Sequence, residues 1–433
     1  GVEFLNTHIY SIMSRFVRSS KYRHVFGTAA KRDDSYDQIK VNRSAWDTNK
    51  VSTSTEMWGC VWEAGGGGAF VVKKHSDTGK GTANPPLVAG HKAAVLDIAF
   101  SPFNPYVVAS ASEDCMVKIW SIPEEGLTEN MTEEAQLLKG HKRKVGGIAW
   151  HPTALNVLAS TSTDYLVKVW DVETGKTNTE ISGHANIIQS FAWSPNGSMA
   201  ATASKDKKLR LFDPRQQDSV QEWKSHDGVK GSRIIFLGDT GLLCSVGFSR
   251  SSDRQYYIWD PKNLEKPIAK ANIDTSSGML MPFYDNDTKL LFLAGKGDGN
   301  IRYYEITGEE KIAYYLTEFK SSDPQKGMTM CPKRMMDVPK CEIVRMLKVT
   351  SKNMVVPITF RVPRKSELFQ DDIFPDCYAG VFTATAEEYF GGKDGEVEKM
   401  SMEPDEMPVK KVVAPTSFQK QEEEKELTPQ EMK

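Results

Sequence analysis

Short apolar alternations separated by polar turn residues recur along most of the chain, and such alternation predicts β-strands with one buried face. The stretch 140–171 (GHKRKVGGIAWHPTALNVLASTSTDYLVKVWD) begins with Gly-His and ends with Trp-Asp. Between these pairs lie an apolar alternation, a proline turn, a strand of small residues and an Asp turn. The stretches 90–120 and 183–213 repeat the pattern in register, so most of the chain is an array of one unit.

The three copies agree position by position when they are counted from the histidine of each Gly-His pair. Apolar residues stand four, seven and nine residues after the histidine, and a proline that ends the strand stands eleven residues after it. An Asp follows, with an aromatic residue six positions beyond it, and this spacing recurs at 253–259 and 298–304. The period of roughly 42 to 50 residues is that of a propeller blade.

These residues resemble the WD-repeat family, whose blades are four-stranded antiparallel sheets around a central channel. The repeated Asp lies in a predicted tight turn, where a carboxylate can accept backbone N–H groups. The resemblance implies that it also holds the histidine, which bonds a hydroxyl that meets the Trp indole. That hydroxyl belongs to Ser110 or Ser112 in one copy and to Ser160 or Ser162 in the next. The expected blade clamps are His91, Asp114, Trp120, His141, Asp164, Trp170, His184 and Asp206.

A catalytic His/Asp/Ser triad is the alternative interpretation of these residues, and repetition argues against it. Three copies of a structural clamp are expected in an array, whereas three copies of a triad are not. The third copy has Phe212 in place of Trp, and the next unit has Ser225-His226 in place of Gly-His. Those blades are expected to depend more on packing.

The pattern divides the chain into an all-β, seven-bladed propeller over 13–361 and an extended segment over 362–418 packed on one face. Blade one is predicted at 39–74, blades two to four at the aligned copies, blade five at 226–260 and blade six at 279–306. The segments 312–319, 342–349 and 353–362 supply blade seven, and a strand around 22–26 closes the ring, which leaves no open edge. Residues 1–12 look like an expression remnant. Residues 419–433 are charged and helix-prone but lack sustained heptads, so they form the start of a linker without a coiled coil.

Four aromatic side chains are expected to anchor the C-terminal extension on the propeller. They are Phe369, Phe374, Tyr378 and Phe390.

Composition excludes several classes of function. The 433 residues carry a formal net charge of −2, so bulk basicity does not indicate nucleic-acid binding. The six cysteines lack metal-binding spacing, which favours free thiols in a reducing cytoplasm. No apolar run approaches the roughly 18 residues of a membrane span, and no signal peptide is evident. The glycine runs at 65–68 and 295–300 do not precede a helix, so they predict turns, and no cofactor or metal is expected.

Four stretches narrow the resemblance to the coronin family of actin-binding proteins. They are SRFVRSSKYRHVFG (14–27), WEAGGGGAF (62–70), FSRSSDRQYYIWDP (248–261) and VPRKSELFQDDIFPD (362–376). The resemblance implies a seven-bladed propeller, an extension on one face, and a cytoplasmic location at the actin cortex. It also implies a C-terminal coiled coil that makes homo-oligomers, and this sequence stops before any such coil.

The resemblance further implies that basic propeller residues bind filamentous actin and thereby regulate filament organisation and turnover. The family's best-known basic contact aligns with Lys40, where the family often has Arg; Lys keeps the charge without the two-pronged hydrogen bonding. The expected actin-binding residues are Lys40, Arg43, Lys31, Arg32, Lys21 and Arg23. Arg23 could instead pair within the closing strand, and a second basic run at 205–210 is interpreted mainly as a blade turn.

Two alternatives remain beside the non-enzymatic actin binder. A general interaction scaffold would bind other proteins, including actin-regulatory ones, and a basic N-terminus could also bind an anionic phosphoinositide membrane. A propeller enzyme finds no support, because the recurring histidines and aspartates are expected in clamps and no clustered carboxylates appear.

Overall fold

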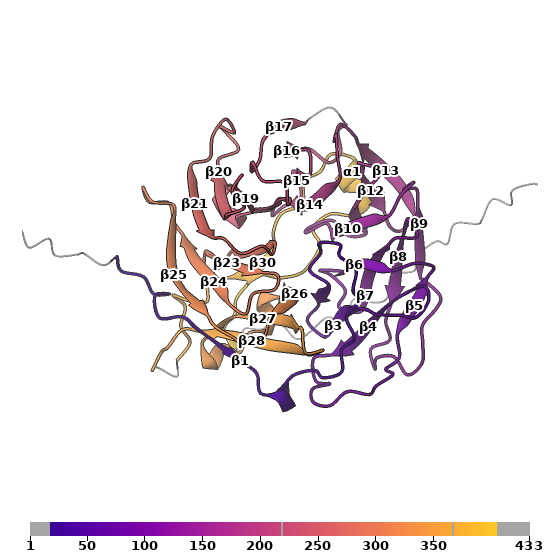
Figure 1. The fold of residues 1–433 in the computed structure, drawn as a ribbon, viewed down its shortest axis with the longest axis horizontal. Helices are drawn as coiled ribbons and strands as arrows, with labels where there is room; N and C mark the ends of the chain where they lie inside the picture. Colours follow the sequence, from indigo (N-terminus) through magenta and orange to yellow (C-terminus); the bar gives the residue numbers. More distant parts are fainter. Residues whose placement is uncertain (1–17, 218–219, 366–367, 405–433) are drawn as a thin grey trace, which may run out of the picture.

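The computed structural model describes residues 18–217, 220–365 and 368–404. Seven four-stranded antiparallel sheets follow one another around a central axis, and the strand colours run once around the ring (Figure 1). The structure confirms the predicted all-β, seven-bladed propeller. The predicted remnant at 1–12 and the linker at 419–433 lie outside the described residues.

Each blade contains four strands in consecutive order, except that the last blade borrows its outer strand from the start of the chain. Blade one has β2 (Val51–Thr53), β3 (Met57–Trp62), β4 (Gly68–Lys74) and β5 (Val88–His91). Blade two has β6 (Val95–Phe100), β7 (Val107–Ser112), β8 (Met116–Ser121) and β9 (Gln136–Lys139). Blade three has β10 (Val145–Trp150), β11 (Val157–Ser162), β12 (Val167–Asp171) and β13 (Lys176–Ile181). Blade four has β14 (Ile188–Trp193), β15 (Ala200–Ser204), β16 (Lys208–Phe212) and β17 (Gln221–Lys224).

Blade five has β18 (Arg233–Phe236), β19 (Leu243–Phe248), β20 (Arg254–Trp259) and β21 (Ala269–Asp274). Blade six has β22 (Leu280–Asp285), β23 (Leu290–Gly295), β24 (Ile301–Ile306) and β25 (Ala313–Phe319). Blade seven has β26 (Gln325–Met330), β27 (Glu342–Thr350), β28 (Val355–Arg361) and β1 (Phe26–Ala29).

Four assignments differ from the sequence prediction. Blade five ends with β21, which lies beyond the predicted 226–260. β25 pairs with β24, so it is the outer strand of blade six rather than part of blade seven. The inner strand of blade seven is β26, whose polar sequence QKGMTM gave little strand signal; its Gln325 is fully buried and donates to the carbonyls of Gly295 (2.8 Å) and Asn300 (2.9 Å). Blade one begins at β2 and extends to β5, beyond the predicted 39–74.

The ring closes through β1, which pairs with β28 in antiparallel register from Phe26↔Arg361 to Ala29↔Ile358. The strand therefore starts where the predicted 22–26 strand was expected to end. Residues 21–24 form a turn, and Tyr22 in the turn and Val25 just after it are buried. Pairing of the two ends of the propeller leaves the last blade four-stranded like the others.

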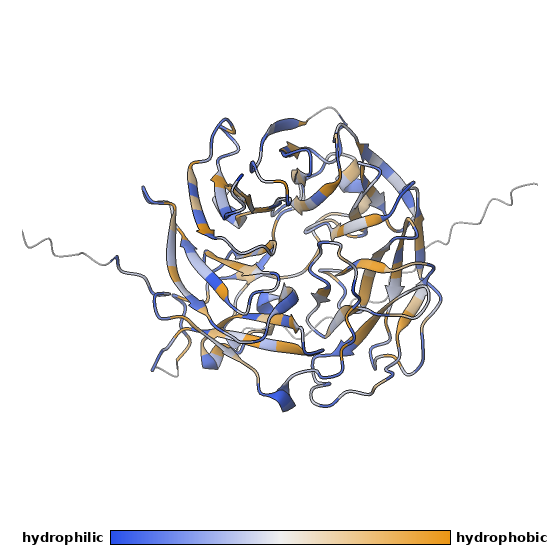
Figure 2. Ribbon diagram, viewed as in Figure 1, coloured by the Kyte–Doolittle hydropathy of each residue, from blue (hydrophilic) through white to orange (hydrophobic). Residues whose placement is uncertain are grey.

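Large aromatic side chains pack between neighbouring blades. Trp58, Trp120 and Trp170 are each at most 1% exposed, and the rings of Phe70 in blade one and Trp120 in blade two meet edge to face at 6.1 Å. Hydrophobic positions lie along the strands while the connecting loops are mainly hydrophilic (Figure 2). No helix among the described residues is both long and apolar enough to cross a membrane.

Strand direction gives the ring two different faces. We call the clamp face the one that carries the turns between the second and third strands of each blade and the connections from each blade to the next. The opposite face, which carries the turns between first and second strands, is the extension face. The C-terminal extension packs there: its Tyr378 hydroxyl donates to Pro152 O (2.6 Å), Ala384 bridges Ala154, and Tyr389 donates to Gly197 O (3.2 Å).

The extension has little regular structure of its own. α1 (Ala386–Phe390) is a single turn capped by Thr385 and Glu388, and β29 (Cys377–Tyr378) pairs only with β30 (Lys399–Met400). Its order comes from contact with the propeller.

Candidate interaction face

Blades two and three contain complete polar clamps. His91 Nδ1 lies 2.8 Å from Asp114 Oδ2, His91 Nε2 lies 2.7 Å from Ser110 Oγ, and Trp120 Nε1 donates to the same hydroxyl at 2.8 Å. Since the carboxylate accepts from Nδ1–H, Nε2 accepts from the hydroxyl, and every polar group has a partner. The structure thus selects Ser110 over Ser112, which donates to a backbone carbonyl instead.

The blade-three clamp has the same geometry. His141 contacts Asp164 at 2.9 Å and Ser160 at 2.7 Å, and Trp170 Nε1 donates to Ser160 at 2.8 Å. Burial alone would raise the pKa of Asp164, but the His141 bond and two backbone N–H groups outweigh it and lower that pKa to about 2. The carboxylate is therefore charged whenever the protein is folded near neutral pH.

Blade four keeps only half of the clamp. His184 Nε2 lies 2.9 Å from Thr202 Oγ1, but Asp206 pairs with Arg210 at 2.7 Å instead of with the histidine. Burial, reinforced by the Arg210 charge, lowers the pKa of His184 to about 4. Phe212 supplies no indole N–H, so the Thr202 hydroxyl, which takes the place of the clamp serine, bonds the histidine alone.

Blade five retains a clamp that the sequence did not predict. His226 Nε2 lies 3.0 Å from Ser245 Oγ, and Trp259 Nε1 donates to Ser245 at 2.9 Å. Asp253, at the repeated position, accepts from Ser249 and Ser251 instead. The sequence did contain a signal for this clamp, because the repeated Asp-to-aromatic spacing at 253–259 placed Trp259 at the position of the clamp tryptophan.

The segment 42–49, just before blade one, crosses the clamp face and binds several blades. Asn42 Nδ2 donates to Val95 O, Trp46 Nε1 to Gly146 O and Thr48 Oγ1 to Leu96 O, each at 2.7 Å. These bonds join the segment to blades two and three.

On the other side of the ring, Asp47 of the same segment pairs with two cations. Arg233 contacts its carboxylate at 2.9 and 3.1 Å, and Lys296 at 2.7 Å. Burial would raise the pKa of Asp47, but Arg233 and Lys296 lower it to about 2. Burial lowers the pKa of Lys296 to about 8 against the opposing effect of Asp47. Blades five and six are thereby tied to the start of the chain.

The six predicted actin-binding cations do not form one cluster. Lys21 and Arg23 precede β1 on the extension side, where Lys21 Nζ donates to Asp372 O and Arg23 donates to Arg18 O. These two side chains bind the chain's own backbone.

The other four lie where blade seven meets blade one. Arg32 pairs with Asp37 at 2.8 Å, Lys40 Nζ donates to Ala83 O at 3.1 Å, and Lys31 is exposed beside them. The Arg43 side chain is 86% exposed, with Glu63 at 3.2 Å as its partner. Arg43 therefore presents its charge on the clamp face, and Lys40 lies beside it, because the Lys40 backbone carbonyl accepts from Glu63 N–H at 2.8 Å in the turn between β3 and β4.

The clamp face carries further cations beyond the six predicted, among them those of the second basic run at 205–210. They stand in the Gly-His connections and the Asp turns of blades two to five, where exposed acidic side chains are few. The exposed cations are Lys92, Lys142, Arg143, Lys205, Lys207, Lys230 and Arg250. Lys208 and Lys224 are exposed at the adjoining ends of β16 and β17, where they pair with Glu222 and Asp227. The exposed acidic residues in the same turns of blades one to five are Glu63 and Glu113. A chain with net charge −2 thus presents a basic face.

Known families match most of the chain. Residues 85–121, 132–171 and 175–213 match the family described as "WD domain, G-beta repeat", and residues 355–397 match "Type of WD40 repeat". Residues 15–80 match "Domain of unknown function (DUF1899)". These matches fall on blades and on the N-terminal segment described above.

Whole-chain comparisons are more specific. Coronin-A of Dictyostelium discoideum is 54% identical over 390 residues, which cover 90% of this chain and 87% of that protein. Coronin-2A of Homo sapiens is 40% identical over 393 residues, which cover 89% and 75%. The crystal structure of the WD40 domain from Toxoplasma gondii coronin superposes with a TM-score of 0.83 at 32% identity, over 88% of this chain and 98% of that one.

A chain of the mitotic checkpoint complex superposes with a TM-score of 0.58 at 14% identity, over 78% of this chain and 96% of that one. At that identity the likeness shows the propeller fold alone. With two relatives above 30% identity across nearly all of its length, the chain belongs to the coronin family of WD-repeat proteins.

Proposed function

We propose that this protein is a non-enzymatic actin-binding protein, which binds filamentous actin through its clamp face and regulates filament organisation and turnover at the cell cortex. The observation that carries the proposal is the charge of that face. Seven exposed cations stand in the turns and connections of blades two to five, whereas Glu63 and Glu113 are the exposed acidic residues in the same part of blades one to five. The partly exposed Asp227 pairs with Lys224 at the end of β17 and lies 3.9 Å from Arg250, so it offsets part of this charge. Actin filaments present acidic surfaces, so the two charge patterns are complementary.

Rigidity supports the proposal. The segment 42–49 holds blades two, three, five and six by side-chain bonds, so the cations on their turns keep their spacing before a partner arrives. A preorganised surface loses little conformational entropy on binding. Because exposed charges are screened beyond about 8 Å at physiological ionic strength, binding should weaken as salt is raised.

The histidines that resemble catalytic bases have structural partners. The His91 side chain is fully buried, and both of its ring nitrogens are engaged inside blade two. The same holds for His141, whose side chain is 1% exposed. These environments support a scaffold rather than a catalytic centre.

Cosedimentation with actin filaments tests the proposal through Lys40→Glu. The lysine bonds only a backbone carbonyl among the contacts described for it, so reversal should leave the melting temperature unchanged. Exposed ion pairs contribute roughly 0.2–1 kcal/mol each, and reversal adds repulsion, so we expect an affinity loss of about 5- to 30-fold.

Lys176→Glu is the matched control, because Lys176 is an exposed outer-strand lysine at the extension-face end of β13. It should bind filaments like the wild type. If Lys40→Glu binds filaments with unchanged affinity, Lys40 is not part of the contact. A second variant, Lys92→Glu/Lys142→Glu, reverses two other charges of the clamp face, and unchanged affinity in that variant would refute the clamp face as the binding surface.

A second candidate function is adhesion to an anionic phosphoinositide membrane. The observation that favours it is Val229, which is 73% exposed in the connection between Lys224 and Lys230. An exposed aliphatic residue flanked by lysines suits insertion at a charged lipid surface. Flotation with phosphoinositide vesicles tests it, and the uncharged substitution Val229→Ser should weaken flotation if the membrane is a partner while leaving filament cosedimentation intact.

A further inference from the structure

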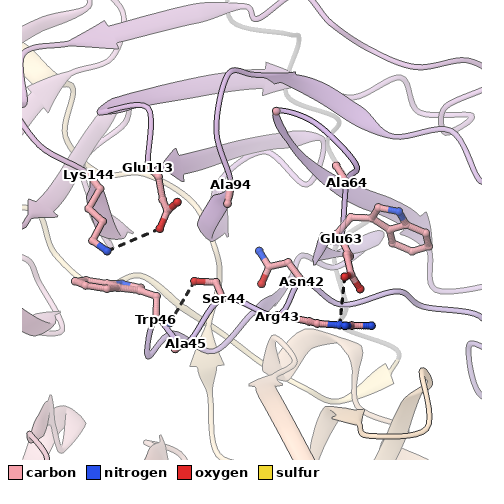
Figure 3. Close-up of a pocket in the computed structure, with 12 residues that line it drawn as sticks. Asn42, Arg43, Ser44, Ala45, Trp46, Glu63, Ala64, Ala94, Glu113 and Lys144 are labelled. Atoms are coloured by element: carbon pink, nitrogen blue, oxygen red, sulfur yellow. Dashed lines mark hydrogen bonds and ion pairs between the residues drawn. The ribbon is translucent and has the colours of Figure 1, made fainter.

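A cavity of about 530 Å³ opens on the clamp face between the segment 42–46 and the turns of blades one to three (Figure 3). Its volume falls within the roughly 300–1,000 Å³ of ligand-binding pockets. Small residues, including Ala64 and Ala94, and the Trp46 ring form its walls. The cavity is large enough to admit part of another chain.

The tryptophan wall is fixed before any ligand binds. Trp46 Nε1 donates to Gly146 O at 2.7 Å, and its backbone N–H bonds Ser44 Oγ at 3.2 Å. A Cβ at Gly146 would lie only 2.1 Å from the indole, so the ring rests directly on that backbone. The apolar surface is therefore preformed.

Two ion pairs stand at opposite ends of the cavity, as Figure 3 shows. Arg43 contacts Glu63 at 3.2 Å, and Lys144 contacts Glu113 at 3.8 Å. The Lys144 ammonium also lies 4.9 Å from the centre of the Trp46 ring, and this cation–π contact helps to hold the lysine side chain at the cavity. All four charged side chains are at least 39% exposed, and exposed pairs of this kind are weak. A ligand charge can displace either partner.

The surroundings decide the sign of the ligand. Lys92, Lys142 and Arg143 are exposed on the adjoining Gly-His connections, so the field at the cavity mouth is positive. We propose that the cavity binds a short acidic chain segment of a partner protein, whose carboxylates pair with Arg43 and Lys144 while its aliphatic parts pack on Trp46. This inference deepens the proposed function and rests on it only for the identity of the partner.

Fluorescence anisotropy with the full chain and a labelled oligoglutamate peptide tests the inference. Arg43→Gln/Lys144→Gln should weaken binding about tenfold or more, whereas Glu63→Gln/Glu113→Gln should tighten it about threefold. Lys142→Gln/Arg143→Gln is the matched control, since it removes the same charge from a neighbouring turn outside the cavity; it should weaken binding less than about threefold.

A variant that fills the cavity without changing charge separates entry from contact at the rim. Ala94→Phe, verified to melt like the wild type, should weaken oligoglutamate binding as strongly as loss of the two cations. Unchanged binding by Ala94→Phe would place the peptide outside the cavity. If Lys142→Gln/Arg143→Gln weakened peptide binding as much as Arg43→Gln/Lys144→Gln, the attraction would come from the whole face and not from the cavity. If an oligolysine peptide bound more tightly than oligoglutamate, the cavity would prefer a basic ligand. Each result overturns the inference.

Parallel filament cosedimentation keeps the two proposals apart. A wild-type chain that cosediments with filaments but does not bind oligoglutamate overturns the cavity assignment alone. A chain that binds the peptide but not filaments overturns the proposed function alone.

Discussion

The clamp of blade three can be tested by removing one oxygen atom. In Ser160→Ala the backbone of β11 and its register are unchanged, but Trp170 Nε1 and His141 Nε2 both lose the hydroxyl that they share at 2.8 and 2.7 Å. Ser160 is fully buried, so water cannot reach the two ring nitrogens without opening the blade. The substitution therefore leaves two buried polar atoms unpaired at once.

The expected cost follows from those two atoms. An unpaired buried donor or acceptor costs roughly 1–3 kcal/mol, so Ser160→Ala should lower the free energy of unfolding by about 3 kcal/mol. With an unfolding entropy of about 2.1 cal/mol/K per residue, a 433-residue chain should then melt about 3 °C lower. Ser162→Ala is the control on the same strand: Ser162 is also buried, and it donates to Arg143 O at 3.1 Å and accepts from Asp164 N–H at 3.2 Å. Asp164 lies in a partly exposed turn, where water can replace the lost acceptor, so only about 1 kcal/mol is expected.

A double-mutant cycle in a thermal or urea titration separates the clamp from general packing. Trp170→Phe removes one of the two orphaned groups, so Ser160→Ala should cost about 1–2 kcal/mol less in that background than in the wild type. Blade four already shows this state, because Phe212 replaces the indole and Thr202 serves His184 alone. Strict additivity of the two substitutions, or a Ser160→Ala cost no larger than that of Ser162→Ala, would show that the hydroxyl is not the centre of the network.

Local repetition made most of the ring predictable from the sequence. The shared spacing of Gly-His, Asp and aromatic residues fixed strand positions in blades two to four, because register within a blade depends on residues close in the chain. Where repetition faded, the prediction slipped. The weakly apolar β26 was missed because Gln325 satisfies buried carbonyls rather than filling the core, and β25 was consequently assigned to the wrong blade.

The candidate interaction face depends on contacts that no local pattern encodes. Asp47 meets Arg233 and Lys296, which lie 186 and 249 positions away in the sequence, so only the closed ring brings them together. Lys21 and Lys40 are near neighbours in sequence, yet they lie on opposite sides of the propeller because β1 runs between them. Proximity in sequence was therefore a poor guide to which cations share a surface.

Two further predictions concern buried charge. His151 Nδ1 accepts from Thr153 N–H (3.1 Å) and Ala154 N–H (2.8 Å), and burial lowers the pKa of His151 from 6.5 to about 3. Between these two pH values the unfolded chain binds a proton at His151 that the folded chain does not bind. The free energy of unfolding should therefore fall as the pH drops from 6.5 toward 3. In His151→Asn the acid-side slope of the unfolding free energy, measured by urea titration at several pH values, should decrease by up to one proton, and an unchanged slope would contradict this assignment. Asp47→Asn leaves the cations of Arg233 and Lys296 facing each other without the carboxylate between them. Removing one partner of a fully buried ion pair costs about 3–5 kcal/mol. Because these groups are partly solvated, we expect the free energy of unfolding to fall by roughly 2–4 kcal/mol. Since Lys296 has a pKa of about 8 even with Asp47 present and a lower one without it, the variant should recover stability relative to the wild type as the pH is raised from 7 to 9. Asp47→Asn/Lys296→Met should be more stable than Asp47→Asn alone, because it removes the stranded charge; if the double variant is no more stable, the cations are not held in place by Asp47 and the segment 42–49 must be fixed by its bonds to blades two and three.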